Sequence, residues 1–238
     1  MSDRRRGQHT KERVLEEACK VFAEKGYRDA THAEICRRAG TNVAAVNYYF
    51  ESKESLYRAV FDHLVRKAEI LYPLDGGLLA AAAPEERLRA FVHAFLSRMF
   101  DPERLGYLHR IRMAEMFDPT GLLTEPLGRR LVQDREHILR ILREFLGPQT
   151  SQRDVEWCEL SIVGQCLMAA PGPDGEGPRL IFGLDATEVD RLAEHILMFS
   201  LAGIEAVRPT GKERLGLVQS CSGTDTNGLR THDDEFRH

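Results

Sequence analysis

The chain has 238 residues, of which 42% are hydrophobic and 29% charged, and its formal net charge is −4. This composition is ordinary for a folded globular protein, and the length is sufficient for two modest domains. No apolar stretch approaches the roughly 20 residues that a membrane-spanning helix requires. The charged opening leads into an amphipathic pattern, not into a signal peptide. We therefore expect a cytoplasmic protein without a membrane partner.

The sequence shows no recognisable catalytic or metal-binding arrangement. It lacks the H-E-x-x-H zinc motif, a glycine-rich phosphate loop and a G-x-S-x-G elbow. Its five cysteines are scattered and form no C-x-x-C pair, which favours buried, reduced thiols. We expect no catalytic residue, no metal and no cofactor, so the chain is not predicted to be an enzyme. The alternative is a helical enzyme that acts on a small molecule, and measured turnover of any substrate would support it.

Charge is distributed unevenly along the chain. Residues 1–70 contain 14 Lys and Arg against 11 Asp and Glu, whereas residues 71–238 contain 19 against 26. The N-terminal part is therefore better suited to a polyanion. Residues 1–9 include three consecutive arginines and predict a polar arm that contacts DNA or, alternatively, a disordered tail. The first helix is expected to begin with Thr10 as its cap and to end at Gly26.

Two short helices joined by a tight turn follow. Thr31 is a suitable N-cap for a helix that ends at Arg38, and Glu34 is placed to complete a capping box. Gly40 supplies the backbone freedom for a sharp turn. A second helix over residues 43–50 is preceded by Thr41 or Asn42 as its cap. This pattern predicts a helix-turn-helix, in which the second helix enters the major groove of DNA.

Small and polar residues begin the second helix, as an approach to base edges requires. Asparagine can pair with adenine, and apolar side chains can contact the thymine methyl group. Hydroxyl groups and a lysine at a helix start can bind phosphate. The expected base-facing residues are Asn42, Val43, Ala44 and Asn47, and the expected phosphate-binding residues are Thr31, Tyr48, Tyr49 and Lys53. The alternative is that the aromatic residues are core positions of a helical protein-interaction module that binds no DNA.

The run AGTNVAAVNYYFESKESLY, residues 39–57, resembles the DNA-binding signature of the TetR family of bacterial repressors. The similarity extends upstream through TKERVLEEACKVFAEKGYRDAT, residues 10–31. Many members have Tyr at the position of Asn47 and His at that of Tyr49. The Asn-Tyr-Tyr-Phe variant resembles the CecR-like branch, as do SIVGQCLMAAP and HILMFSLAGIEAV near the far end.

The resemblance implies an all-α protein with an N-terminal helix-turn-helix domain and a C-terminal helical bundle for dimerisation and ligand binding. We assign residues 1–55 to the DNA-binding domain, residues 56–207 to the effector-binding and dimerisation domain, and residues 208–238 to a disordered tail. The expected function is that of a ligand-responsive repressor. Its partners would be a pseudo-palindromic, double-stranded operator, an unknown small-molecule effector and a second copy of the chain.

Helical spacing predicts the elements of the second domain. Helices are expected to begin at Pro84, to restart at Asp101-Pro102, and to cover residues 125–146, 153–170 and 187–207. The first of these carries an apolar stripe of Leu88, Phe91, Val92, Phe95, Leu96 and Met99, and the spacing of the second places Ala114 inside. The arginines of the helix over 125–146 are expected on a solvated face, with Asp134 among their partners. The last two helices are apolar on more than one face and contain small residues, which predicts a four-helix dimer interface or, alternatively, a pair buried within one subunit. The small residues are Ser161 and Gly164 in one helix and Ala193, Ser200 and Gly203 in the other.

Aromatic residues, methionines and a few charges gather in the helices between residues 95 and 117. Such a mixture is typical of an adaptable small-molecule cavity. The alternative is that Met and Phe at helical spacing are ordinary core residues, and the resemblance implies a pocket without identifying its walls. The tentative ligand-binding residues are Phe95, Met99, Tyr107, Arg112, Met113 and Met116.

Overall fold

The computed structural model describes residues 2–101, 105–171 and 182–208, and every regular element in these ranges is helical. The predicted all-α fold is confirmed. None of the described helices is both long and apolar enough to cross a membrane. Of the predicted disordered tail, residues 209–238 lie outside the described ranges, and so do residues 172–181 of the Gly/Pro-rich loop.

The first four helices carry the predicted helix-turn-helix. Their bounds are α1 (Ser2–Asp29), α2 (His32–Arg38), α3 (Val43–Phe50) and α4 (Lys53–Leu71). The predictions that residues 1–9 form an arm and that Thr10 caps the first helix are wrong, because α1 begins eight residues earlier. Gln8 donates a hydrogen bond to Glu12 at 2.7 Å across the expected start. The backbone leaves the helical conformation at Gly26, where φ is 72°, so the predicted break is present.

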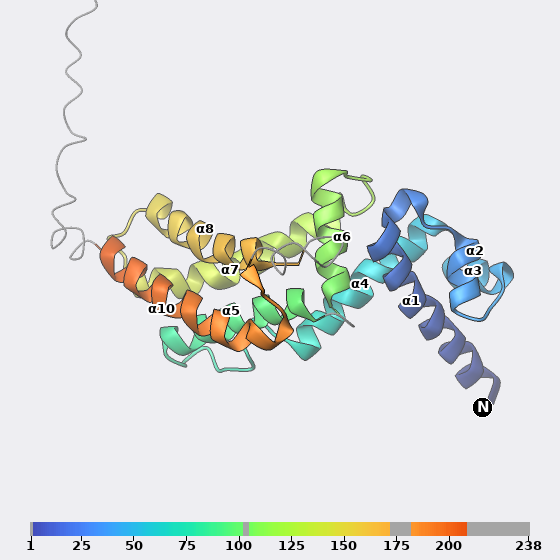
Figure 1. Cartoon of the computed structure of the whole chain (residues 1–238), viewed down its shortest axis with the longest axis horizontal. Helices are drawn as coiled ribbons and strands as arrows, with labels where there is room; N and C mark the ends of the chain where they lie inside the picture. The colour runs from blue at the N-terminus through green and yellow to red at the C-terminus, as the bar shows by residue number, and fades with distance from the viewer. Residues whose placement is uncertain (1, 102–104, 172–181, 209–238) are drawn as a thin grey trace, which may run out of the picture.

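The remaining helices form a second group. They are α5 (Pro84–Phe100), α6 (Gly106–Phe117), α7 (Thr124–Leu146), α8 (Gln152–Ala169), a 3-10 turn η1 (Ala186–Glu188) and α10 (Val189–Val207). Helices α5, α7, α8 and α10 pack together at one end of the molecule, and α2 and α3 lie at the other end (Figure 1).

Helix α6 stands across the centre of the molecule, between these two groups (Figure 1). One hydrophobic cluster joins α1–α4 with Leu108 and Ile111 of α6, whereas the other joins α5, α7, α8 and α10. The boundary that we assigned at residue 55 falls in the first turn of α4, whose buried side chains belong to the first cluster. The domain division stays a prediction.

Helical spacing located most core positions correctly, but three positions differ from expectation. The apolar stripe of α5 is buried as predicted. On α6, Ala114 is exposed, although the spacing placed it inside. On α7, the Arg130 side chain is only 14% exposed and Asp134 is 7% exposed, whereas both were expected on a solvated face. They are buried because Arg112 of α6 and Glu69 of α4 cover that part of α7.

The turn between α2 and α3 depends on Gly40. Its φ of +57° lies in the left-handed region, where a side chain costs about 1 kcal/mol or more. Gly40→Ala is therefore expected to lower the free energy of unfolding by about that amount. Gly128→Ala is the matched control, because a Cβ at this helical position meets no atom within 4 Å. It should stabilise the protein by about 0.5 kcal/mol. Urea denaturation followed by circular dichroism tests both, and a neutral Gly40→Ala would contradict the assigned role of Gly40.

Candidate nucleic-acid interface and internal cavity

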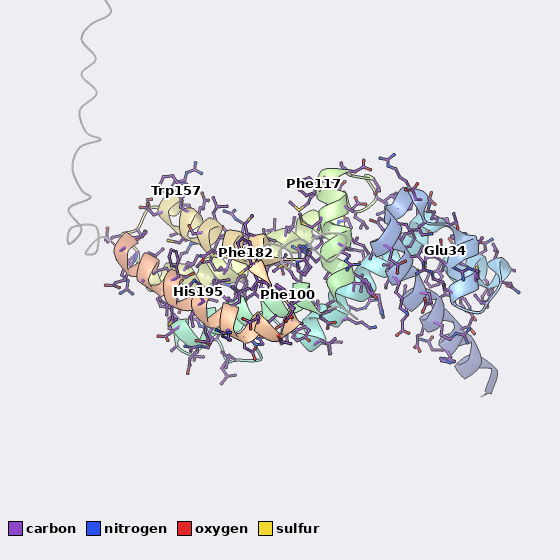
Figure 2. All side chains as sticks on the ribbon, in the orientation of Figure 1. Glu34, Phe100, Phe117, Trp157, Phe182 and His195 are labelled. Atoms are coloured by element: carbon purple, nitrogen blue, oxygen red, sulfur yellow. The ribbon has the colours of Figure 1, made fainter. Side chains whose placement is uncertain are left out.

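Side chains cap both helices of the helix-turn-helix. The Thr31 hydroxyl accepts a hydrogen bond from the Glu34 amide at 3.2 Å, and the Asn42 carbonyl oxygen accepts one from the Ala45 amide at 2.9 Å. Asn42 is thus the second cap, which the sequence left open between two residues. The capping box predicted for α2 is only half formed, because the Glu34 carboxylate pairs with Lys25 and Arg38. The pair with Lys25 joins α2 to α1, near the position of Glu34 in Figure 2, whereas the pair with Arg38 lies within α2.

Arg13 of α1 contacts the turn between α2 and α3. Its guanidinium group, on α1, donates hydrogen bonds to the backbone carbonyl of Ala39 and, at 3.3 Å, to that of Gly40. The carbonyl groups at the end of α2 have no partner within the helix, so a cation there is favourable. The orientation of α3 relative to α1 is therefore held by a charged contact as well as by apolar packing.

One face of α3 is anchored and the other is open. Val46 is fully buried and Phe50 is 6% exposed, so these two residues hold the helix on the first hydrophobic cluster. The open face carries the four predicted base-facing residues together with Tyr48, which is 81% exposed. The oxygen of the Asn42 amide is engaged in capping, which leaves its nitrogen as the donor available to a base.

The other predicted phosphate-binding residues lie at the edges of this face. Thr31 is exposed at the start of α2. Tyr49 is half-buried, and a methyl group added at Gly7 would lie 3.1 Å from its hydroxyl oxygen, so this side chain borders α1. The Lys53 ammonium donates to the Arg28 carbonyl oxygen at 3.1 Å and lies 4.6 Å from the centre of the Tyr27 ring. It therefore lies at the junction of α1 and α4, where the start of α4 points its amide groups outward.

A cavity of about 730 Å³ lies between the two groups of helices. Its walls come from α5, α6, α7 and α8, from the end of α1 and from Tyr57 of α4. This volume is in the range of small-molecule sites, roughly 300–1,000 Å³. Five of the six tentative ligand-binding residues line it: Phe95, Met99, Arg112, Met113 and Met116. The sixth, Tyr107, does not line it; this residue packs on the first cluster, on the side of α6 that faces α1.

A buried carboxylate connects the cavity wall to α4. Glu115 of α6 is 6% exposed and accepts a hydrogen bond from the Tyr57 hydroxyl at 2.9 Å. The hydroxyl and amide of Thr120 also donate to it, at 2.7 and 3.2 Å. Burial, and then the Glu115 charge, raise the pKa of Tyr57, so this phenol stays a donor at neutral pH. No local sequence pattern predicts this link, because the partners are 58 positions apart.

Arg98 and Arg112 line the cavity, and Arg130 of α7 lies near them without lining it. Arg130 Nε lies 2.9 Å from one oxygen of Asp134, while Arg112 Nη1 lies 3.5 Å from the other. Arg98 Nε donates to the Tyr72 carbonyl oxygen at 2.9 Å. Burial lowers the pKa of Arg98 to about 10 and also lowers that of Arg112. A guanidinium group in a protein stays protonated at neutral pH, so this part of the structure carries an excess of positive charge.

Arg98 is a cavity residue that was not predicted, and Asp134 is buried where a solvated position was predicted. A signal for Arg98 existed, because this residue follows Phe95 by three positions on the apolar stripe of α5. A cation on a stripe that is otherwise buried is costly unless it is paired or has a function. No comparable signal existed for Asp134, since its burial depends on how α6 crosses α7.

Two protein families match this chain, one in its N-terminal part and one in its C-terminal part. Residues 14–60 match the family described as bacterial regulatory proteins, tetR family. Residues 84–204 match the C-terminal domain of the HTH-type transcriptional dual regulator CecR. The first match covers the helix-turn-helix and the second covers most of the helices that surround the cavity.

Curated relatives are similar over most of the chain. The HTH-type transcriptional regulator BetI of Brucella suis biovar 1 is 26% identical over 196 residues, which cover 80% of this chain and 90% of BetI. The HTH-type transcriptional regulator SrpR of Pseudomonas putida is 26% identical over 148 residues, covering 62% of this chain and 64% of SrpR.

Solved structures share the fold. A TetR transcriptional regulator of Chloroflexus aurantiacus superposes with a TM-score of 0.62 at 20% identity, covering 82% of this chain and 96% of that one. A transcriptional regulator of Rhodococcus sp. superposes with a TM-score of 0.59 at 19% identity, covering 82% and 95%. At these identities the similarity establishes the arrangement of helices.

His109, in the cavity wall, makes stability dependent on pH. Burial, and then the charges of Arg112 and Arg110, lower its pKa from 6.5 to about 4. Between these values the unfolded chain binds a proton that the folded chain does not, so the free energy of unfolding falls as pH falls. The loss by pH 4 should be on the order of 2 kcal/mol. His109→Gln should remove that part, whereas His195→Gln, at an exposed site on α10, should not. Urea denaturation at pH 7, 5.5 and 4 measures this, and equal pH dependence in His109→Gln and wild type would refute it.

Proposed function

The chain belongs to the TetR family of bacterial regulatory proteins, with a CecR-type C-terminal domain, and is a DNA-binding transcriptional regulator; from this premise we propose that it is a ligand-responsive repressor. It binds a pseudo-palindromic operator as a homodimer and responds to a small-molecule effector in the central cavity. The absence of catalysis and the cytoplasmic location stay predictions.

The open face of α3 is the observation that carries the proposal. Val43, Ala44 and Asn47 project from a helix whose opposite face is anchored by Val46 and Phe50. Small side chains allow the helix to approach the groove floor, and the Asn47 amide can pair with an adenine. The N-terminal end of α3 enters first, as in other helix-turn-helix proteins.

Phosphate contacts border this face in our proposal. Tyr48 is exposed on α3, Thr31 caps α2, and Lys53 is the first residue of α4. Lys53 keeps two further ammonium donors after its bond to the Arg28 carbonyl oxygen, so it can bind phosphate without leaving that partner. Such contacts set register and affinity but carry no sequence information.

Exposed apolar side chains on α8 and α10 support dimerisation. Trp157, Leu160 and Met168 of α8 are 58%, 68% and 74% exposed, and Met198 and Phe199 of α10 are each 64% exposed. Trp157 lies on the outer side of α8 (Figure 2). Large apolar side chains gathered in this way usually mark an interface. Two small residues that we had assigned to this interface, Ala193 and Ser200, are buried within the subunit.

Helix α6 supplies a route from the cavity to the DNA-binding helices. Arg112 and Met113 of α6 line the cavity, Ile111 of the same helix is buried in the cluster of α1 and α4, and Leu108 belongs to both. A ligand that displaces α6 therefore acts on α4, which begins three residues after α3 ends. An effector that prefers the displaced arrangement must weaken DNA binding by its own difference in affinity.

Binding to the DNA upstream of the protein's own coding sequence tests the function. Tight binding that protects a symmetric site, beside weak binding to random duplex of equal length, is the expected result in fluorescence anisotropy and footprinting at two salt concentrations. Absence of any salt-sensitive DNA binding would reject the proposal in favour of a protein-interaction module.

Two substitutions separate phosphate contacts from base contacts in the same assay. Lys53→Ala should weaken binding to operator and random duplex alike and reduce the salt slope by about one. Asn47→Ala should relax preference at one base position per half-site, at about 1–3 kcal/mol. Arg191→Ala, which removes an exposed cation from α10, is the control and should leave DNA binding unchanged. A Lys53→Ala defect confined to the operator would contradict the phosphate role.

Phe199→Glu tests the dimer. Two carboxylates would face each other across an apolar interface, so the variant should be monomeric by light scattering coupled to size-exclusion chromatography. Its operator affinity should fall, because a monomer binds one half-site. Leu79→Glu is the control, since Leu79 is 80% exposed in the loop after α4 and should leave the dimer intact. A dimeric Phe199→Glu variant would remove α10 from the interface.

A further inference from the structure

The central cavity contains two kinds of wall. Phe91, Phe95 and Met99 of α5 and Ile138 of α7 form an apolar wall. Arg98 lies on the same face of α5, and Arg112 reaches the cavity from α6. A ligand that fills this space meets hydrocarbon along one part and guanidinium groups at another.

The positive charge is incompletely matched within the protein. Among the residues that the structure describes, the carboxylates that pair with Arg112 and Arg130 are those of Asp134 and Glu69, and the Glu69 side chain is half exposed. Arg98 has a backbone carbonyl as its described partner. Asp134 is thus shared between two arginines while a third lies beside them.

Arg112 is only weakly paired. Its side chain is 17% exposed, yet its contact with Asp134 is 3.5 Å long, at the outer limit of a hydrogen bond. A guanidinium group has five N–H donors and a planar fork that matches a carboxylate. Burial of a charge with so little compensation is costly, and an anion in the cavity would offset that cost.

The other buried carboxylates of the described wall do not compensate these arginines. Glu115 accepts its hydrogen bonds from Tyr57 and Thr120. Glu159 pairs with Arg135 at 2.9 Å. A cationic ligand would find both of these acids engaged and would lie beside surplus arginines, so the charge pattern favours an anion.

We propose that the cavity binds an amphipathic carboxylate, whose head group pairs with Arg112 and Arg98 and whose apolar body lies against Phe95, Met99 and Ile138. This inference deepens the proposed function and rests on it, because it names the chemical class of the effector. A bidentate carboxylate–arginine pair fixes the orientation of the ligand, and the methionines adapt to its body.

The same pairing reaches α4. Arg98 holds the carbonyl oxygen of Tyr72, the residue that caps the C-terminal end of α4. A carboxylate that draws the Arg98 guanidinium toward itself competes with this hydrogen bond. The end of α4 is thereby released or moved, while the start of α4 adjoins the DNA-binding helix. Ligand charge, and not only ligand volume, thus acts on the DNA-binding domain.

Isothermal titration calorimetry with three probes of equal chain length tests the ligand class. Decanoate, decan-1-ol and decylamine differ only in the head group, and each is titrated into the full-length protein without DNA. Decanoate should bind at least about tenfold more tightly than either other probe, as expected for a charge-assisted pair. Equal or tighter binding of decan-1-ol or decylamine, or no binding of decanoate, would overturn the proposal.

Substitutions of Arg112 assign the head group. Arg112→Gln should weaken decanoate by about tenfold or more and leave decan-1-ol unchanged, whereas Arg112→Lys should retain part of the preference. Arg129→Gln is the matched control, because it removes an arginine from the exposed face of α7 and should not alter binding. Equal weakening of decanoate and decan-1-ol in Arg112→Gln would overturn the assignment to Arg112.

DNA binding is measured separately, so the two proposals can fail independently. Operator affinity with and without decanoate should differ at least several-fold if the carboxylate acts as the effector. A protein that binds decanoate but no DNA refutes the repressor function and keeps the ligand class. If the protein binds its operator equally tightly with and without bound decanoate, the effector role is refuted.

Discussion

The Glu115 carboxylate, 6% exposed, accepts hydrogen bonds from the Tyr57 hydroxyl and from the hydroxyl and amide of Thr120. A buried acid of this kind is tolerable only while its partners stay in place, since each lost donor would expose the full cost of desolvation. Tyr57 belongs to α4 and Glu115 to α6. The hydrogen bond therefore constrains the two helices to move together, and the arrangement of the DNA-binding domain on the bundle depends on it.

Because α4 and α6 move together, a change at the cavity can affect the position of α4. Helix α6 presents Arg112 and Met113 to the cavity and Ile111 to the cluster of α1 and α4, while Leu108 contacts both. Close-packed interiors adopt discrete arrangements and do not deform continuously. A ligand at one face of α6 therefore has to be accommodated at the other face. The hydrogen bond from Arg98 to Tyr72 provides a second connection at the far end of α4.

Local rules explain which parts of the fold were predictable. The turn around Gly40, the Thr31 cap and the buried stripe of α5 follow from neighbours in the sequence, and each was predicted correctly. The burial of Arg130 and Asp134 could not be predicted in this way, because α6 and α4 create it from distant positions. For the cavity, residue types indicated the right helices, but Tyr107 shows that they do not determine which face of α6 a residue occupies.

Hydrogen exchange followed by mass spectrometry, with and without the operator duplex, tests the coupling through α6 most directly. Binding of DNA at α3 should change the protection of amides in residues 106–117 of α6, because binding effects at coupled sites are reciprocal. Changes confined to residues 31–53 would contradict the account. In that case α6 would be a passive wall of the cavity, and the route from ligand to DNA would have to run elsewhere.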